Sequence, residues 1–483
     1  MQKQSLSKNF IFQFLYQGLI LLIPLVLSPY LTRVLQETAL GTYTYINSTA
    51  YYFVIFAMLG ISRHGQRIVS QNVNDELKLR KAFWSLFTLH AAISLLSVVL
   101  YFVFILIFVN TDKTIYIIEA IYVASAIFDI TWLFYGLENF KSVVIKNAFI
   151  KVVECILIFS LVKYPGDLWI YTLITAAGTF LGQVVMLPQA VKTIRPIKFS
   201  KSDISQHIRP LLIFAISVVA STLYTVFDKT LLGLLSTKEN VGFYEYSNKI
   251  INIPKTIIGV IGTVMFPRAC RMAAEGNILG QRKYIKYSFL ITSFIGMGSI
   301  WGLFAISNLF ARLYYGETFS VCGPIIKTMA PLIYVIGIGD IIRTQYMIPN
   351  GMDKQFNFCI VLNAVINLIL STALIPVCGI YGAVIGTISA ELFGIIYQLI
   401  LCRKFIRYGD ILKSLTPFLI IGFIMFASIK LISPHLPQDI IGLIVEVLFG
   451  VVVYCGLSLV YIICFEKDIK TLLGRKFGIR NKQ

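Results

Sequence analysis

The sequence has little charge and no long hydrophilic connection. Asp, Glu, Lys and Arg make up 13% of the 483 residues and apolar residues 57%, whereas soluble domains have about 25% charged residues. Together with a mean hydropathy of +0.79, this composition excludes a soluble globular protein. No connection between apolar runs is longer than about 20 residues. The chain therefore has no room for a separate water-soluble catalytic domain.

Motifs of common enzyme chemistry are also missing. The eight cysteines include no C-x-x-C pair and no His partner at ligand spacing, so they predict neither a disulfide framework nor a metal site. There is no Walker A loop and no nucleophile elbow. The first apolar run, which starts near Phe10, is long enough to span a bilayer and lacks a signal-peptide cleavage site. We expect no catalytic residue, no metal and no cofactor.

The sequence is rich in long apolar runs that are bounded by charged residues or by Pro and Gly. A bilayer span needs about 20 apolar residues and must satisfy its own backbone hydrogen bonds, so these runs predict helices. The expected fold class is an all-α membrane protein with fourteen transmembrane helices. The predicted spans are 10–32, 40–61, 83–109, 115–135, 144–162, 168–188, 210–236, 241–266, 286–311, 321–348, 356–376, 380–402, 415–432 and 440–465.

The net charge of +19 is distributed unevenly along the chain. When connections are assigned alternately to two sides, one side carries about 30 Lys and Arg residues. The other side carries five, which are Arg33, Lys113, Lys163, Lys238 and Arg312. Such an asymmetry is the positive-inside pattern and predicts that both termini are cytoplasmic. The excess charge therefore reflects topology, and we expect no nucleic-acid partner.

Two motifs recur six spans apart, which indicates an internal repeat. The motif G-x-Y-x-Y-x-N starts at Gly41 in the second span and at Gly242 in the eighth. The motif D-I-x-x-x-x-Y-x-x-x-N starts at Asp129 in the fourth span and at Asp340 in the tenth. Because six is even, the repeats share one orientation, as in transporters with a midplane cavity between two halves. The predicted organisation is a six-helix lobe over 1–209, a second over 210–402, and two extra helices with a basic tail over 403–483.

Ionisable side chains inside the spans are the best pointers to function, because burying charge in a bilayer is costly. Lys255 lies near mid-span after Pro254 and has no acid at helical spacing in its own span. Asp228 and Lys229 are neighbours that point about 100° apart and cannot readily pair with each other. Lys151 and Glu154 are three residues apart, and this spacing predicts an ion pair on the surface of one helix.

For two further sets of charges, pairing within one helix explains their presence as well as a role in a functional site does. Glu245 and Lys249 stand at i, i+4, and Asp340 and Arg343 at i, i+3. In the second predicted lobe, cations outnumber acids by one, which favours an anionic ligand. The cations are Lys229, Lys249, Lys255, Lys327 and Arg343, and the acids are Asp228, Glu245, Asp340 and Glu391.

Several ordered segments carry a resemblance to a known family over nearly the whole chain. They are PYLTRVL (29–35), LGISRHGQR (59–67), DITWLFYGLENFK (129–141), YTVFDKTLLG (224–233), VGFYEYSNKIINIPK (241–255), GTVMFPR (262–268) and QYMIPNG (345–351). Together they resemble the bacterial Wzx-type polysaccharide flippases of the multidrug/oligosaccharidyl-lipid/polysaccharide exporter superfamily. The resemblance implies two six-helix lobes plus two terminal helices in the bacterial cytoplasmic membrane.

The resemblance also implies a cargo and a mechanism. Undecaprenyl-diphosphate-linked oligosaccharide repeat units would move from the cytoplasmic to the outer leaflet by alternating access, for capsule, exopolysaccharide or O-antigen assembly. Membrane lipids and other polysaccharide assembly proteins are the further partners expected. The family's pattern places basic residues at Arg33, Lys229, Lys249 and Lys255. With Arg343, these are our predicted substrate-binding residues, since the diphosphate supplies the anion.

The acids in the spans are candidates for ion coupling, namely Asp129, Asp228, Asp340 and Glu391. At Asp340 the resemblance leads us to expect a neutral polar residue more often. The main alternative function is a cation-coupled drug antiporter of the same superfamily, which predicts a cavity dominated by acids. A membrane glycosyltransferase or polymerase would need carboxylates or Arg on a sizeable external loop, and the outer connections are short.

Overall fold

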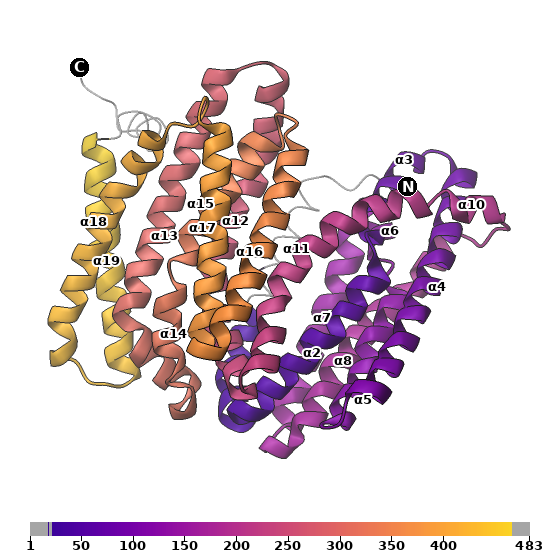
Figure 1. Cartoon of the computed structure of the whole chain (residues 1–483), viewed down its shortest axis with the longest axis horizontal. Helices are drawn as coiled ribbons and strands as arrows, with labels where there is room; N and C mark the ends of the chain where they lie inside the picture. The colour runs from indigo at the N-terminus through magenta and orange to yellow at the C-terminus, as the bar shows by residue number, and fades with distance from the viewer. Residues whose placement is uncertain (1–17, 19–21, 466–483) are drawn as a thin grey trace. The chain divides into compact units, whose positions relative to one another are not determined.

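The computed structural model describes residue 18 and residues 22–465, and every regular element within them is a helix (Figure 1). The all-α prediction is confirmed for this part of the chain. The predicted first span, 10–32, begins outside the described residues, and a helix covers its second half from Leu22 to Val34. The basic tail beyond residue 465 also lies outside them.

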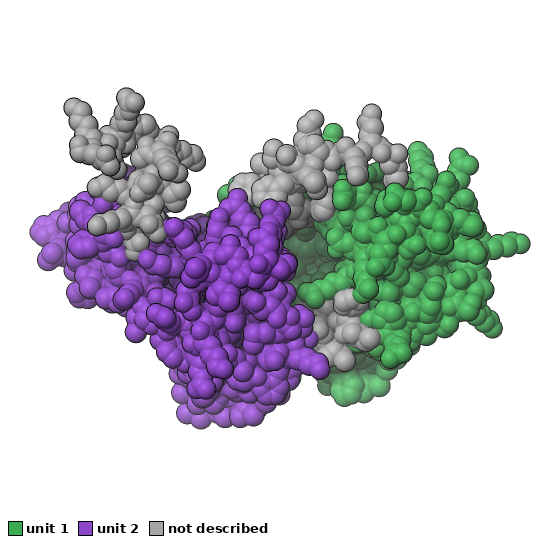
Figure 2. All heavy atoms as spheres, turned by 90° about the horizontal axis from the view of Figure 1, so that it is seen from above, with its two compact units in different colours: residues 1–242 green, residues 243–483 purple. Residues whose placement is uncertain are grey.

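The chain divides into two compact units, residues 1–242 and 243–483 (Figure 2). The helices of the first unit are α2 (Gln36–Met58), α3 (Ile61–Asn72), α4 (Glu76–Phe108), α5 (Lys113–Ser125), α6 (Thr131–Gly136), α7 (Phe140–Leu161), α8 (Leu168–Val184), α9 (Leu187–Thr193), α10 (Lys201–Ser205) and α11 (Ile208–Leu235). Short 3₁₀ turns η1 (Ala126–Phe128) and η2 (Pro165–Asp167) connect some of them. Helix α11 packs against α2 and α3. The predicted lobe boundaries after residues 209 and 402 stay predictions.

Helix α12 (Lys238–Ala274) begins in the first unit and continues in the second. The second unit then contains α13 (Ile278–Tyr315), η3 (Glu317–Phe319), α14 (Cys322–Met329), α15 (Leu332–Ile342), the π-helix η4 (Arg343–Met347), α16 (Asp353–Cys378), α17 (Ile380–Cys402), α18 (Tyr408–Ile432), η5 (Ser433–His435) and α19 (Ile440–Phe465). Helices α13, α15 and α17 run side by side, and α18 and α19 pack against α13 (Figure 1).

Ten of the described helices are long and apolar enough to cross a membrane. An eleventh span results if Glu317–Met329 and Leu332–Met347, which meet at a bend of 43°, count as one. Pro331 stands at this bend, and its missing N–H prevents a continuous ladder of helical hydrogen bonds. Each of the fourteen predicted spans overlaps a helix, but the number fourteen itself stays a prediction.

Glycine allows α16 and α17 to pack backbone against backbone. A Cβ atom on Gly382 would lie 2.4 Å from the carbonyl carbon of Leu374. One turn on, a Cβ on Gly386 would lie 2.3 Å from the Ser371 hydroxyl oxygen, and a Cβ on Gly394 2.3 Å from the Asn363 side-chain oxygen. Small residues at every fourth position are the usual route to close helix contact in membranes.

The repeated motif G-x-Y-x-Y-x-N also starts with a glycine for a steric reason. In the first unit, a Cβ on Gly41 would lie 1.7 Å from the carbonyl oxygen of Lys238. A Cβ on Gly242 would lie 3.1 Å from the carbonyl oxygen of Glu37 and 3.2 Å from the backbone nitrogen of Gly41. The two motif glycines therefore mark the place where the first turns of α2 and α12 cross.

An apolar core holds the π-helix of the second unit in place. Phe289 of α13, Ile338 and Ile342 of α15 and Met347 of η4 are all buried in one cluster. Gln281 of α13 also donates from its amide to the carbonyl oxygen of Gln345 in η4 at 2.8 Å. This packing fixes the direction in which the side chains of α15 and η4 leave the backbone.

Candidate functional site

Four ionisable side chains gather inside the second unit. Lys255 comes from α12, Asp340 from α15, Arg343 from the start of η4, and Glu391 from α17. Lys255 interacts electrostatically with Glu391 and Asp340, and Arg343 with the same two acids. We call these four residues the charge cluster. All four were predicted site residues, and the structure brings them together although they come from four separate elements.

The best-defined contact of the charge cluster joins Arg343 and Asp340. The guanidinium Nη2 lies 2.5 Å from Asp340 Oδ1, so the i, i+3 pairing that the spacing left open does form. The Arg343 side chain is 13% exposed and the Asp340 side chain 39%. Arg343 also begins the π-helix, an irregularity that is frequent at functional sites. Asp340 therefore orients a largely buried guanidinium.

Lys255 lies one residue after Pro254, inside the continuous helix α12. Because proline has no backbone N–H, the carbonyl of Ile250 lacks its usual helical donor at this point. Lys255 is half-buried. Its acidic neighbours are on α15 and α17, as expected for a lysine without an acid at helical spacing in its own span.

Glu391 is the most deeply buried acid of the charge cluster, with 4% of the residue exposed. The side-chain amide of Asn363 on α16 lies 3.4 Å from Glu391 Oε2. A little further along the same helix pair, the amide of Asn367 donates to the hydroxyl of Thr387 at 3.2 Å. The close packing of α16 and α17 therefore encloses a row of polar side chains next to the charge cluster.

The charge cluster holds two cations and two acids. Its formal charge is zero when all four groups are ionised, so it does not reproduce the cationic surplus of the whole predicted lobe. An anionic ligand at Arg343 would have to compete with Asp340 for the guanidinium. A cationic ligand would find two carboxylates, each already close to a cation. The arrangement suits the exchange of one anionic partner for another.

Lys249 lies elsewhere on α12. Its ammonium sits 4.0 Å from the centroid of the Tyr246 ring, which is within cation–π range. Tyr246 is in turn held by Tyr315 of α13, whose hydroxyl donates to the Tyr246 carbonyl at 2.9 Å. Lys249 is thus placed by an aromatic pair about two turns before the charge cluster.

The remaining predicted cations belong to the first unit. The exposed Arg33 donates from Nη1 to the carbonyl oxygen of Pro29 in its own helix at 2.7 Å. On α11, Lys229 interacts electrostatically with Tyr51 of α2. The buried Asp228 interacts with Tyr52, whose hydroxyl lies 2.9 Å from Thr230 Oγ1. Asp228 and Lys229 thus influence two different tyrosines of α2.

Asp129 has a local structural role. Its carboxylate accepts from the backbone N–H of Thr131 at 3.0 Å and from the Thr131 hydroxyl at 2.6 Å. It stands where the helical segment η1 ends and α6 begins. An acid that bonds to the residue two positions on is a typical start of a new turn. This capping accounts for Asp129, and its coupling role stays a prediction.

Sequence reasoning missed a buried polar contact in the first unit. Glu119 of α5 is 1% exposed, and Asn47 of α2 donates to its Oε1 at 3.4 Å. Glu119 is not among the predicted site residues. The sequence did contain a signal for this contact, because Asn47 is the asparagine of the repeated motif G-x-Y-x-Y-x-N.

A second missed contact joins two histidines. His64 Nε2 lies 3.2 Å from His207 Nδ1, and His207 Nε2 lies 2.9 Å from the hydroxyl of Ser85. Both histidines are buried. Burial lowers the pKa of His207, with the Asp203 carboxylate opposing the shift. Nothing in the local sequence signals this pair, because its members are 143 residues apart.

Other expectations for charged side chains can be checked directly. Lys151 and Glu154 form an ion pair with 2.7 Å between Nζ and Oε2, which confirms the predicted helix-surface pair. Lys430 of α18 donates to the carbonyl oxygen of Ala305 at 2.9 Å. All eight cysteines are free thiols.

Long apolar helices in two units, with a charge cluster in one of them, define a multi-pass helical membrane protein. Residues 6–273 match the family described as "Polysaccharide biosynthesis protein". The chain belongs to this family. A putative O-antigen transporter of Shigella dysenteriae is 25% identical over 398 residues, which cover 82% of this chain and 99% of that protein. The resemblance to Wzx-type flippases is thereby confirmed.

Solved structures show that the fold is shared more widely. The lipid II flippase MurJ, in an inward closed conformation, superposes with a TM-score of 0.78 at 16% identity, over 94% of this chain and 99% of that one. An inward-facing multidrug resistance transporter of the MATE family reaches 0.60 at 13% identity, over 81% and 95%. At these identities the likeness concerns the fold alone.

Proposed function

We propose that the protein flips undecaprenyl-diphosphate-linked oligosaccharide repeat units from the cytoplasmic to the outer leaflet. The observation that carries this proposal is the match to a putative O-antigen transporter along 99% of that protein's length. The charge cluster supports it, because a buried guanidinium and a half-buried ammonium are suited to a diphosphate. Flipping serves capsule, exopolysaccharide or O-antigen assembly, and other assembly proteins are its expected partners.

The proposal includes a topology. Fourteen spans, arranged as two parallel six-helix repeats followed by two extra helices, would place both termini in the cytoplasm. The overlap of each predicted span with a helix supports this number. The distribution of Lys and Arg supports the orientation. The protein would act as a transporter without catalytic residues, metal or cofactor.

The charge cluster suggests how cargo binding is coupled to a conformational change. Asp340 is the ion-pair partner of Arg343. The diphosphate would take the place of this carboxylate on Arg343, since a guanidinium binds phosphate and carboxylate in the same forked geometry. Asp340, released from Arg343, would then accept a proton or a sodium ion. One partner exchange thereby links cargo, ion and the helices that carry the cluster, in an alternating-access cycle.

The second candidate is a cation-coupled drug antiporter, for which the acids of the charge cluster are the favouring observation. Such a protein would use Glu391 and Asp340 to exchange a cationic drug for protons or sodium. Against it stands the balance of two acids by two cations, because an antiporter for cations calls for an excess of carboxylates.

The test is reconstitution of the purified protein in liposomes with a fluorescent oligosaccharide on a polyprenyl diphosphate, scoring the fraction exchanged between leaflets. We expect exchange by the wild type, and a loss of about tenfold or more for Lys255→Ala, because a charge-assisted phosphate contact is worth about 1.5–3 kcal/mol. Lys249→Ala should also reduce exchange. Exposed Lys413 of α18 supplies the matched control, Lys413→Ala.

Two results would count against the proposal. Normal exchange by Lys249→Ala, Lys255→Ala and the double variant, at equal protein in the liposomes, would remove the assigned site. Export of a cationic dye against a proton gradient, without exchange of the lipid-linked cargo, would favour the antiporter.

A further inference from the structure

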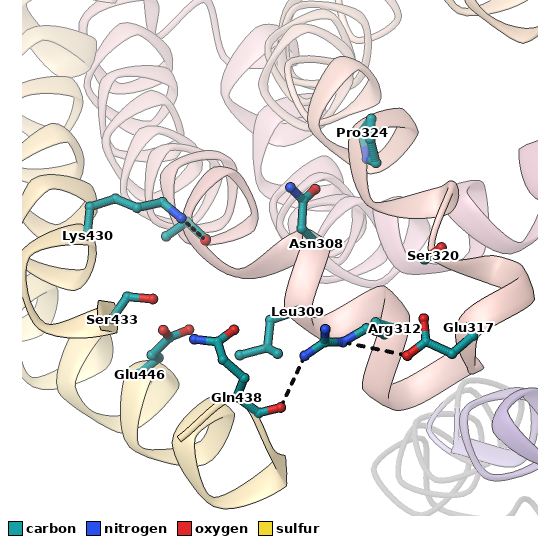
Figure 3. Close-up of a pocket in the computed structure, with 11 residues that line it drawn as sticks. Asn308, Leu309, Arg312, Glu317, Ser320, Pro324, Lys430, Ser433, Gln438 and Glu446 are labelled. Carbon is teal, nitrogen blue, oxygen red and sulfur yellow. Dashed lines mark hydrogen bonds and ion pairs between the residues drawn. The ribbon is translucent and has the colours of Figure 1, made fainter. Parts of the chain in front are cut away.

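A polar pocket lies in the second unit, away from the charge cluster. Its volume is about 480 Å³, and it is bordered by the end of α13, by α14, and by the α18–α19 connection (Figure 3). The predicted topology puts this end of the helices on the outer side of the membrane. The proposed transport function does not use this pocket.

The pocket is lined by two cations and two acids. Lys430 of α18 and Arg312 of α13 are the cations, and Glu446 of α19 and Glu317 of η3 are the acids. Arg312 Nη2 donates to the carbonyl oxygen of Gln438 at 3.1 Å, and its Nε lies 4.0 Å from Glu317 (Figure 3). Arg312 is thus held at the rim by one hydrogen bond and a loose ion pair.

Lys430 and Glu446 line the same pocket without pairing. Lys430 bonds to the carbonyl oxygen of Ala305, and within residues 22–465 it forms no ion pair. Glu446 is only 2% exposed, yet its carboxylate has neither a hydrogen bond nor an ion pair in this described range. A buried carboxylate without a partner is costly. Its position indicates that a ligand with a positively charged donor completes the pocket.

The cations that line the pocket favour a phosphate. Lys327 of α14 interacts electrostatically with Lys430 and so adds to the positive charge there. The Lys430 ammonium has three donors and uses one on Ala305. A ligand that carries both a phosphate and an ammonium group would therefore match Lys430 through its phosphate and Glu446 through its ammonium.

The surroundings of the pocket indicate that this ligand is a lipid. Leu431, Ile440 and Ile441, at the same ends of α18 and α19, are 74%, 60% and 65% exposed. In a transmembrane helix such side chains face acyl chains. No aromatic ring, on which a sugar could stack, lines the pocket within the described part of the chain.

We propose that this pocket binds the head group of a zwitterionic phospholipid with a primary ammonium, that is, a phosphoethanolamine lipid. The phosphate lies at Lys430 and the ammonium at Glu446, while the acyl chains follow the apolar face of α18 and α19. Such a lipid would join α18 to α19 through its head group and would stabilise their packing.

The experiment measures binding of short-chain lipids to the full-length protein in detergent, by native mass spectrometry and by the shift in melting temperature. Phosphatidylethanolamine should bind more tightly than phosphatidylglycerol, which lacks the ammonium. Glu446→Gln should lower this preference by about tenfold, the value of one charge-assisted contact. Lys430→Met should weaken both lipids. The control Lys413→Met, at the other end of α18, should change neither.

A second measurement needs no variant. Successive N-methylation of the head group, up to phosphatidylcholine, removes ammonium donors one by one and should reduce binding to the wild type at each step. A wild type that prefers phosphatidylglycerol, a Glu446→Gln variant that keeps the wild-type preference, or an N-methylation series without effect would each overturn the proposal. Flipping in liposomes is a separate readout, so failure of the lipid site leaves the transport proposal untouched.

Discussion

Lys255 and Arg343 show how cations are kept inside an apolar unit. Each lies near both Asp340 and Glu391, so neither charge is left alone in a medium of low dielectric. Removing one acid would strand a cation, at a cost of several kcal/mol for a buried pair. The acids therefore have a structural reason to be present whether or not an ion is transported.

The spacing of charges along one helix could be interpreted from sequence, but contacts between helices could not. Asp340 and Arg343 are three residues apart, so their pairing was one of two stated possibilities. Lys255 and Glu391 come from two helices that are far apart in the sequence, and only the tertiary fold of the second unit brings their charges together. The direction of a side chain around its helix depends on irregularities such as η4, which single-sequence patterns do not reveal.

The buried histidine His207 makes stability depend on pH. Burial lowers the pKa of its imidazole in the folded protein, whereas an unfolded histidine has a pKa of about 6.5. The unfolded state therefore binds the proton more readily, and stability is present above about pH 6.5 and lost as the pH falls below it. His64 is in contact with His207, so protonation of both histidines would place two positive charges side by side.

We expect the melting temperature of the wild type in detergent to fall between about pH 7.5 and pH 5. His207→Gln should reduce this fall, and His435→Gln, at an exposed histidine of η5, should leave it as in the wild type. Equal pH dependence of the wild type and His207→Gln would contradict the assignment.

At the scale of helices, the close approach of α16 and α17 makes a steric prediction. An added Cβ on Gly382 would meet the backbone of Leu374 at 2.4 Å, and a backbone cannot move aside as a flexible side chain can. Gly382→Ala should lower the free energy of unfolding by about 1–3 kcal/mol, the usual cost of overpacking. Thermal unfolding in detergent, followed by tryptophan fluorescence, measures the loss.

Gly409 of α18 is the matched control, because nothing lies within 4 Å of a Cβ built there. Gly409→Ala should be neutral or slightly stabilising, since alanine is the better helix former. If both variants melted like the wild type, the contact between α16 and α17 would be looser than described.

Helix positions were predictable because the thickness of a bilayer sets the length of an apolar run. Breaks within the helices were harder to predict from the sequence. The two repeat-related segments that begin at Asp129 and Asp340 both carry an irregularity, a break before α6 in one and the π-helix η4 in the other. Both breaks depend on tertiary packing, and the shared motif marked their places without indicating their geometry.

For the whole molecule, the proposed cargo makes transport sensitive to voltage. If the cargo carries about two negative charges and the protein returns unloaded, the potential contributes about 2.3 kcal/mol per charge per 100 mV. Without a coupled cation the total is about 4.6 kcal/mol, more than about a thousandfold in the equilibrium ratio, and one cation taken up by Asp340 with the cargo would halve it to about 2.3 kcal/mol. Outward flipping in liposomes should accelerate under a potassium diffusion potential that makes the donor side negative.

A valinomycin-free sample at the same potassium gradient is the control. Equal rates at either sign of the potential would rule out net movement of charge. In that event Asp340 and Glu391 would each have to carry a cation in the same direction as the cargo, which a sodium or pH gradient would reveal.

The packing of α16 on α17 also restricts where a lipid tail can pass. Gly382, Gly386 and Gly394 leave no gap between the two helices, since even a single methyl group would overlap its neighbours. A polyprenyl chain is much wider than a methyl group. The polyprenyl tail therefore cannot pass between α16 and α17. A lateral opening for it in the second unit has to lie between a different pair of helices.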